Sequence, residues 1–221
     1  MNNLSQDFQK YLKSKKVSEQ FISHYQANRA NQFFDEVGPM FPNDVFNRLL
    51  RDRIIILSGD IETNICELIK ANLLYLESLD SKEDITIYIN SPGGSVYDGL
   101  GLLDIMEYIK PEIVTINTGL AASMAAIILC CGNKGKRKAL KRSRTMIHQP
   151  MMGFGGYSQA SDIEIDAKEI NLLKKELYEI ISEKSGQTYS KVEKDGDRDY
   201  WLSAIEAKKY GMIDDILIKR P

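Results

Sequence analysis

The chain has 221 residues, of which 43% are hydrophobic and 27% are charged, and its formal net charge is −2. These values are typical of a globular protein with one sizeable core or two small ones. The near-neutral charge gives no support for a nucleic-acid partner or an anionic membrane. No apolar run is long enough to cross a bilayer and no secretory signal opens the chain, so we expect a cytoplasmic protein.

The cysteines argue against a disulfide framework and against a metal site. There are three of them, Cys66, Cys130 and Cys131, an odd number with two adjacent and without metal-ligand spacing. Buried, reduced thiols are therefore expected.

The first part of the chain differs in composition from the rest. Residues 1–43 are rich in Asn, Gln, Lys and Ser, and they include the turn-forming stretch Gly38–Pro42. We interpret 1–43 as an N-terminal extension and 44–221 as the folded domain.

Strand and helix patterns alternate along residues 44–221. The predicted strands are Arg53–Leu57, Ile85–Asn90, Ile113–Thr118, Arg144–His148 and Ile213–Ile218; the predicted helices are Ile61–Ser78, Val96–Ile109, Ala121–Cys131, a long one from a capping box at Ser161–Glu164 to Ser185, and a short one capped by Ser203–Glu206. This alternation predicts an α/β fold with a largely parallel sheet.

The chain has two histidines, so any histidine-dependent mechanism has two candidate residues. His24 lies in the polar extension, where a solvent-facing role is favoured. His148 ends an apolar strand, where an imidazole can face a cleft on a fixed backbone. From the residues alone, a catalytic His148 and a hydrogen-bonded core His148 are equally supported.

Ser123 lies among small residues where a strand is followed by a helix (GLAASMAA, Gly119–Ala126). Gly119 would permit a tight turn, and the helix N-terminus would offer free N–H groups to a developing oxyanion. This arrangement is like a nucleophile elbow without its usual Gly-x-Ser-x-Gly spelling. Taken alone, however, the segment favours a tightly packed core helix.

Two further segments bear on the same chemistry. Ser91–Ser95 (SPGGS) follows a strand, but no Gly-Lys-Ser/Thr comes after it, so an oxyanion-hole strand fits better than a phosphate loop once Ser123 is considered. For a carboxylate, the chain offers Asp195, Asp197 and Asp199, and spacing does not select among them.

Together these segments resemble the proteolytic subunits of the Clp protease, the ClpP family. The resemblance runs in order from Asp44 to the end, and its most specific motifs are AASM and MIHQP; the matching stretches are Arg48–Gly59, Ile87–Asp98, Gly119–Ala126, Gly135–Pro150, Gln159–Ile170 and Asp197–Ala204. It implies the ClpP/crotonase-like α/β fold, with repeated β-β-α units and a protruding handle helix and strand at about 149–185.

The resemblance also assigns roles to residues. Ser123 matches the nucleophile, His148 the general base and Asp199 the orienting carboxylate, while Gly94 and Met124 match the backbone N–H donors of the oxyanion hole. The implied ring–ring contacts are Asp197 and Arg198, and the implied docking residues are Tyr88 and Tyr108.

The family implies an assembly and partners as well. Two stacked heptameric rings would enclose the active sites, and an AAA+ unfoldase of the ClpX, ClpA or ClpC type would use ATP to feed in unfolded protein substrates. The chain itself would hold no cofactor and no metal. The handle would consist of the long helix and the segment Gly153–Gly156 before it.

This sequence departs from the family pattern at three places. Residues 1–40 do not match the short axial segment, the stretch between His148 and Ser161 is slightly longer, with Met151, Met152 and Phe154, and Thr86 stands where an aromatic is common. Two other functions remain open. One is a crotonase-like acyl-CoA enzyme, which would need no Ser-His-Asp set; the other is a catalytically silent ring subunit, which usually lacks one member of that set.

Overall fold

Strands and helices alternate along most of the chain. The structure is a computed structural model, and it describes residues 43–152 and 159–219. Its elements are α3 (Asn43–Arg51), β1 (Ile54–Ser58), α4 (Thr63–Leu79), β2 (Ile85–Ser91), α5 (Val96–Tyr108), β3 (Ile113–Ala122), α6 (Met124–Cys130), β4 (Arg137–Leu140), β5 (Arg144–Ile147), α7 (Ala160–Ser185), α8 (Tyr189–Asp195), β6 (Tyr200–Ser203), α9 (Ala204–Tyr210) and β7 (Asp215–Leu217).

The strands form one mixed sheet in the order β1-β2-β3-β4-β7, and β5 pairs with both β3 and β6. Only the β5–β6 pair is antiparallel among the described pairings. The predicted α/β fold with a largely parallel sheet is thereby confirmed. Parallel strands are joined through crossover helices, which explains why strand and helix signals alternate in the sequence.

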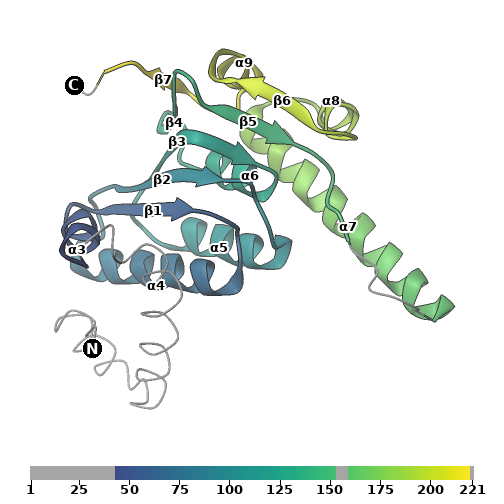
Figure 1. The fold of residues 1–221 in the computed structure, drawn as a ribbon, viewed down its shortest axis with the longest axis horizontal. Coiled ribbons are helices and arrows are strands. Elements are labelled where there is room, and N and C mark those ends of the chain that lie inside the picture. Colours follow the sequence, from purple (N-terminus) through teal and green to yellow (C-terminus); the bar gives the residue numbers. More distant parts are fainter. Residues whose placement is uncertain (1–42, 153–158, 220–221) are drawn as a thin grey trace.

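The core lies between the sheet and helices α4, α5 and α6, which share one face of it (Figure 1). In β2, Ile85, Ile87 and Ile89 are completely buried, as expected for a β-branched strand with alternate residues on the helix-covered face. Every residue of α6 is buried, so this short helix is apolar all round and sits inside the molecule.

Strand β3 is longer than predicted because Gly119 does not break it. β3 continues to Ala122, pairing first with β4 and then, from Leu120, with β5. A side chain at Gly119 would meet the Asn90 amide oxygen at 2.7 Å. That oxygen accepts a hydrogen bond from the Leu120 backbone at 3.0 Å. Gly119 therefore makes room for Asn90, and the predicted tight turn at this position is wrong.

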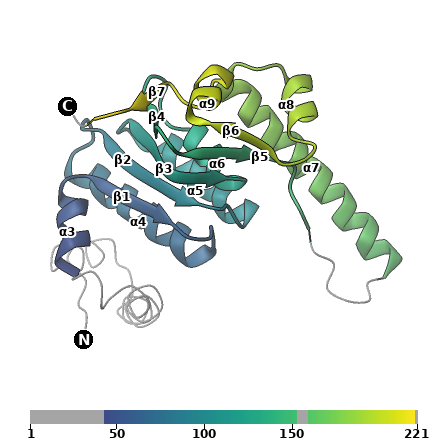
Figure 2. The ribbon, with the colours of Figure 1, turned by 45° about the horizontal axis from the view of Figure 1, so that its top comes forward.

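Helix α7 extends well beyond the rest of the molecule (Figures 1 and 2). Its 26 residues correspond to about 39 Å, but its buried residues begin only at Leu173. The predicted capping box at Ser161 is wrong. The helix begins at Ala160 after Gln159, which makes no side-chain cap, and Glu164 instead pairs with Lys168 one turn further on.

Four elements have no counterpart among the predicted ones: α3, β4, α8 and β6.

The capping box of the last helix is confirmed, with the Ser203 and Glu206 side chains each bonding the other's backbone N–H. Residues 1–42, with His24, and the handle segment Gly153–Gly156 lie outside the described residues.

Candidate active site

Ser123 and His148 lie at the carboxyl ends of two neighbouring parallel strands. Ser123 directly follows β3, and His148 directly follows β5. The two strands pair up to Ala122 and Met146, so both residues emerge at the same edge of the sheet. Ligands of parallel α/β sheets bind at this edge, because the chain turns there from strand into loop or helix.

The backbone at Ser123 has an unusual conformation for a residue with a side chain. Its φ is 55° and its ψ −126°, and it forms the N-cap of α6. Such a conformation costs on the order of 1–3 kcal/mol and persists only where the surroundings impose it. Here the Ser123 N–H donates to the Met146 carbonyl at 2.8 Å, which ties the turn to β5. The result is a sharp strand-to-helix turn that half-exposes the serine side chain.

The imidazole of His148 bridges Ser123 and Asp199. Its Nε2 lies 2.8 Å from Ser123 Oγ, and its Nδ1 lies 3.0 Å from Asp199 Oδ1. A neutral imidazole satisfies both contacts in one tautomer, in which Nδ1–H donates to the carboxylate and Nε2 accepts the serine hydroxyl proton. A hydroxyl paired with a base that is itself oriented by an acid is the arrangement required for nucleophilic catalysis.

The register of β5 against β6 explains why Asp199 is the aspartate that reaches the histidine. Ile147 lies opposite Tyr200 in this antiparallel pair, so the next positions outward are His148 and Asp199. Asp195 is instead in α8, where it pairs with Lys191 at 2.5 Å. The Asp197 carboxylate lies 3.4 Å from the Gln149 amide nitrogen. The sequence analysis could not select Asp199 from the residues alone, because Tyr200–Ser203 was not predicted as a strand. The Tyr-Trp-Leu run in this segment was the signal that could have indicated one.

Gly94 and Met124 both lie beside the serine turn. Met124 is the first residue of α6, where a backbone N–H has no partner within the helix. Gly94 forms a parallel bridge with Ile61, whose N–H and carbonyl bond to Gly93 O and Ser95 N at 2.8 Å each. In that pattern the Gly94 N–H points away from Ile61, and a side chain at Gly94 would collide with Ile61.

Gly93 is a close neighbour of the serine turn that the sequence did not single out. With φ +98°, it lies where a Cβ atom would be 2.6 Å from Ser123 Cβ and 2.7 Å from the Ala122 carbonyl oxygen. Its N–H donates to Ser91 Oγ at 3.1 Å. Glycine at this position lets the Ser91–Ser95 loop pack directly on the serine turn.

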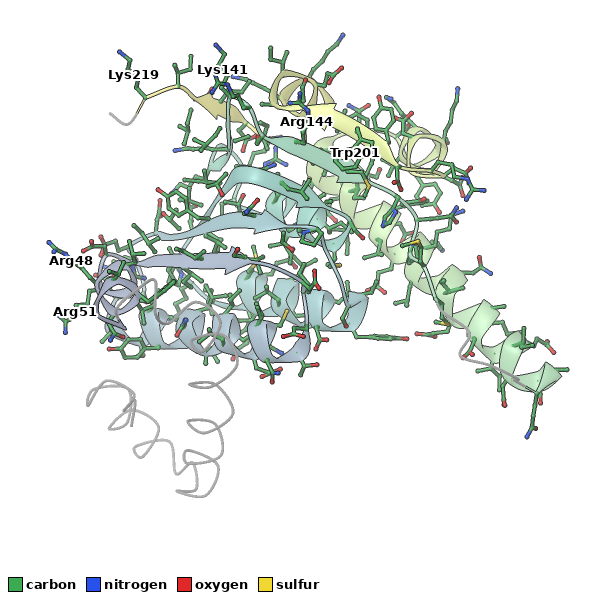
Figure 3. All side chains as sticks on the ribbon, viewed as in Figure 1. Arg48, Arg51, Lys141, Arg144, Trp201 and Lys219 are labelled. Atoms are coloured by element: carbon green, nitrogen blue, oxygen red, sulfur yellow. The ribbon has the colours of Figure 1, made fainter. Side chains whose placement is uncertain are left out.

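The remaining predicted residues lie elsewhere. Tyr88 is half-buried in β2, and Tyr108 is 79% exposed at the end of α5. Arg198 is exposed in the turn before β6. Figure 3 labels basic side chains in two parts of the molecule: Arg48 and Arg51 on α3, and, apart from them, Lys141 in the turn before β5, Arg144 at the start of β5 and Lys219 after β7.

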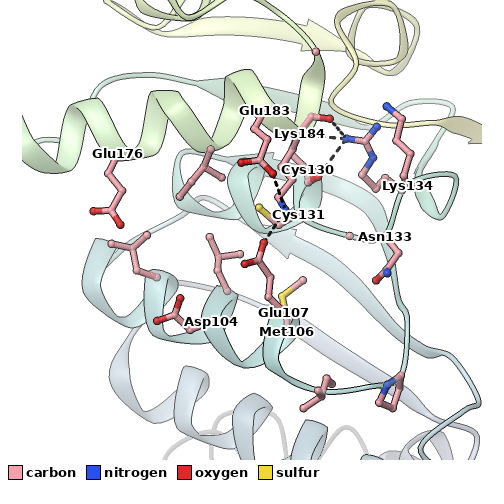
Figure 4. A pocket seen from close by; sticks show the side chains of 18 of the residues that line it. Asp104, Met106, Glu107, Cys130, Cys131, Asn133, Lys134, Glu176, Glu183 and Lys184 are labelled. Atoms are coloured by element: carbon pink, nitrogen blue, oxygen red, sulfur yellow. Dashed lines mark hydrogen bonds and ion pairs between the residues drawn. The ribbon is translucent and has the colours of Figure 1, made fainter.

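A cavity of about 910 Å³ lies apart from these residues, between α5, the end of α6 and the end of α7 (Figure 4). Two of the cations that line it form close ion pairs. Lys184 contacts Glu107 at 2.7 Å, and Arg137 contacts Asp214 at 2.6 Å. Cys130 also lines it, and burial raises the pKa of this thiol to about 11, so it is protonated at neutral pH.

All three cysteines are free and buried, as predicted. In residues 43–152 and 159–219, no group of three or more His, Cys, Asp or Glu side chains is placed to hold a metal ion. The helices in these same ranges are too short or too polar to cross a membrane.

Comparisons with known proteins place the chain in a family. The model of the Clp protease family matches residues 40–220. The chain belongs to the Clp protease family. Its fold is that of this family, as the resemblance implied, and proteolysis is the activity that membership gives it.

Among its relatives are proteins named ATP-dependent Clp protease proteolytic subunit from Bacteroides fragilis and Porphyromonas gingivalis. They are 59% and 58% identical over 80% of this chain, and the matches cover 84% and 78% of those proteins. The ATP-dependent Clp protease proteolytic subunit 2 of a Synechococcus species is 51% identical over 80% of this chain and 89% of its own length. The region of similarity thus spans most of this chain and most of each relative.

Proposed function

We propose that this member of the Clp protease family is a serine endopeptidase whose nucleophile is Ser123. The observation that carries the proposal is the double contact of His148, with Ser123 Oγ at 2.8 Å and Asp199 at 3.0 Å. Serine hydroxyls are poor nucleophiles at neutral pH, and a histidine within hydrogen-bond distance supplies the base that they need.

In the proposed reaction, Ser123 Oγ attacks the carbonyl carbon of a peptide bond while His148 Nε2 takes the hydroxyl proton. Asp199 stabilises the imidazolium, and the N–H groups of Gly94 and Met124 stabilise the oxyanion. The C–N bond then breaks as His148 gives the proton to the leaving amine. Water, deprotonated by His148, hydrolyses the acyl-enzyme. The chain needs no cofactor or metal for any of these steps.

The family resemblance supports a proposal for the assembly. Two stacked heptameric rings would enclose the active sites, with α7 as the handle between rings and Asp197 and Arg198 at the ring junction. An AAA+ unfoldase would dock near Tyr88 and Tyr108 and spend ATP to deliver unfolded proteins. We place this assembly in the cytoplasm, with residues 1–43 as an extension outside the protease domain.

The serine assignment is tested by replacing Ser123 with alanine. Ser123→Ala should abolish peptide hydrolysis and labelling by a fluorophosphonate, because both need the serine oxygen. Ser78→Ala is the matched control: Ser78 is exposed and its hydroxyl bonds the Tyr75 carbonyl in its own helix. The control should be labelled as fast as the unmodified protein.

Labelling, ring formation and coenzyme A binding together separate the alternatives. Labelling that survives in Ser123→Ala would show that another residue is the nucleophile. Rings that form but never react would indicate the catalytically silent subunit. Binding of coenzyme A without peptidase activity would indicate the acyl-CoA enzyme.

A further inference from the structure

The carboxylate of Asp199 is not held in place by burial. Its side chain is 60% exposed, while that of His148 is only 12% exposed. An exposed carboxylate on a turn samples several rotamers unless its backbone is fixed. The position of Asp199 opposite His148 therefore depends on what fixes the turn Gly196–Arg198 that leads into it.

Gln149 contacts this turn at two points. Its backbone N–H donates to the Gly196 carbonyl at 2.7 Å, and its side-chain Nε2 donates to the Asp197 carbonyl, also at 2.7 Å. Gln149 directly follows His148, so these two bonds join the strand end that carries the histidine to the turn that carries the aspartate. They lie beyond the last register position of the β5–β6 pair, in which Ile147 is opposite Tyr200.

Tyr178 contacts the same turn from α7. Its side chain is completely buried in the packed half of α7, and its hydroxyl donates to the Gly196 carbonyl at 2.7 Å. Gly196 is buried against it, since a Cβ atom there would meet the Tyr178 ring at 3.0 Å. Burial raises the pKa of Tyr178 to about 12, so the hydroxyl remains a donor at neutral pH.

The Gly196 carbonyl thus accepts two hydrogen bonds, one from Gln149 and one from Tyr178. A carbonyl oxygen has two lone pairs, so both bonds form together. The turn is held from β5 on one side and from α7 on the other.

We propose that Gln149 and Tyr178 are positioning residues that hold the Gly196–Asp197 turn, and through it the Asp199 carboxylate, against His148. This inference rests on the proposed function, because it assigns these residues to the same catalytic set. Tyr178 also links the long helix α7 to the acid of that set through a single hydroxyl. Within residues 43–152 and 159–219, neither side chain forms a hydrogen bond with Ser123 or His148.

The test uses Gln149→Met and Tyr178→Phe, which keep side-chain size and remove only the donor. Each should slow fluorophosphonate labelling by about 10-fold, since small misplacements of catalytic groups have effects of this order or larger. Each should also move the Nδ1–H proton resonance of His148 upfield, because the hydrogen bond from Nδ1 to a displaced Asp199 carboxylate is longer and weaker. In an Asp199→Asn background, neither change should slow labelling further.

The Nδ1–H resonance is measured by NMR on the full chain enriched in 15N at the histidine ring nitrogens. His24 and His148 are the two histidines, so a His24→Gln background leaves the signals of one ring. Tyr189→Phe is the control: Tyr189 packs edge-to-face on Tyr178 with ring centroids 6.3 Å apart. It should change neither the rate of fluorophosphonate labelling nor the Nδ1–H resonance.

Two results would overturn the proposal. One is a His148 Nδ1–H resonance that is unchanged in both variants. The other is an equal slowing of fluorophosphonate labelling in the Asp199→Asn background, which would mean that Gln149 and Tyr178 only stabilise the fold. If Ser123 is never labelled, the proposed function fails, and the Nδ1–H resonance still decides whether the two residues position Asp199.

Discussion

At the scale of single residues, the candidate site depends on two glycines as much as on its three polar side chains. Gly93 and Gly94 have φ values of +98° and +152°, and each lies where a Cβ atom would overlap backbone atoms or Ser123. Side chains are excluded at both positions for conformational and steric reasons together. The loop can therefore lie directly against the serine turn.

We predict that Gly93→Ala reduces the rate of fluorophosphonate labelling by about 100-fold, comparable with the loss of an oxyanion donor. The added methyl group would stand 2.6 Å from Ser123 Cβ and would displace the serine turn or the loop. Labelling kinetics on the purified variant measure the effect.

Gly101→Ala is the control for this prediction. Gly101 lies within α5, and the nearest atom to an added Cβ is the flexible end of Lys70, at 3.6 Å. Alanine stabilises helix interiors relative to glycine, so this variant should label normally and unfold at a slightly higher temperature. A Gly93→Ala protein that labels as fast as Gly101→Ala would contradict the steric argument.

The residues of the site differ in how far the sequence alone could identify them. His148 stood out because the chain has only one other histidine, and Ser123 because small residues surround it at a strand–helix junction. Asp199 could not be selected by spacing, because its contact depends on the register of β6, a strand of four residues. Gly93 was not identified from the sequence, because its role is to lack a Cβ atom that would collide with Ser123.

At the scale of elements, Arg137 joins four elements of the fold: β4, α6, α7 and β7. From β4, its guanidinium donates to the carbonyls of Cys130 at the end of α6 and Lys184 near the end of α7. It also donates to both carboxylate oxygens of Asp214, just before β7. Arg137 is 1% exposed, so this is a buried ion pair with its hydrogen bonds satisfied.

We predict that Asp214→Asn lowers the free energy of unfolding by about 3 kcal/mol at neutral pH, as expected when one partner of a buried pair loses its charge. Burial by itself would raise the pKa of Asp214, but the hydrogen bonds and charge of Arg137 outweigh it and lower the pKa to about 2. A carboxylate with a lowered pKa stabilises the fold above its unfolded-state pKa of about 4.

The difference between the two proteins should therefore shrink as the pH falls from about 4 to about 2. Urea unfolding across this range measures it. Asp215→Asn is the control, because Asp215 pairs with Lys208 on the surface and such pairs contribute little. A penalty at Asp214 that does not change with pH would mean that the pair is not the source of the stability.

The elements themselves were predictable where hydrophobic periodicity is long and strong. β2 and α5 were found almost to the residue because their buried positions recur at strand and helix spacing. β4, of sequence Arg-Lys-Ala-Leu, was not, because only two of its residues are buried and one of them is Arg137. Its place in the sheet is set by tertiary pairing with β3 and β7, which no local pattern contains.

At the scale of the whole molecule, half of α7 lacks the packing that long helices normally have. The residues buried against the body begin at Leu173, yet Ile165 and Leu172 are 62% and 63% exposed. The Tyr97 hydroxyl donates to Glu169 at 2.9 Å, an exposed bond between α5 and this half of the helix. Exposed aliphatic residues on a projecting helix are typical of a surface that is buried on assembly.

If the chain assembles as the double ring proposed above, Ile165→Asp combined with Leu172→Asp should halve the mass of the particle, to that of a single ring. Two charges at a contact between handles would have to be desolvated without partners, so that contact would open while contacts within each ring remain. Light scattering coupled to size-exclusion chromatography measures the mass. Leu79→Asp is the control, because Leu79 is equally exposed, at 61%, but ends α4 on the body. An unchanged particle mass in the double variant would show that α7 is not the contact between rings.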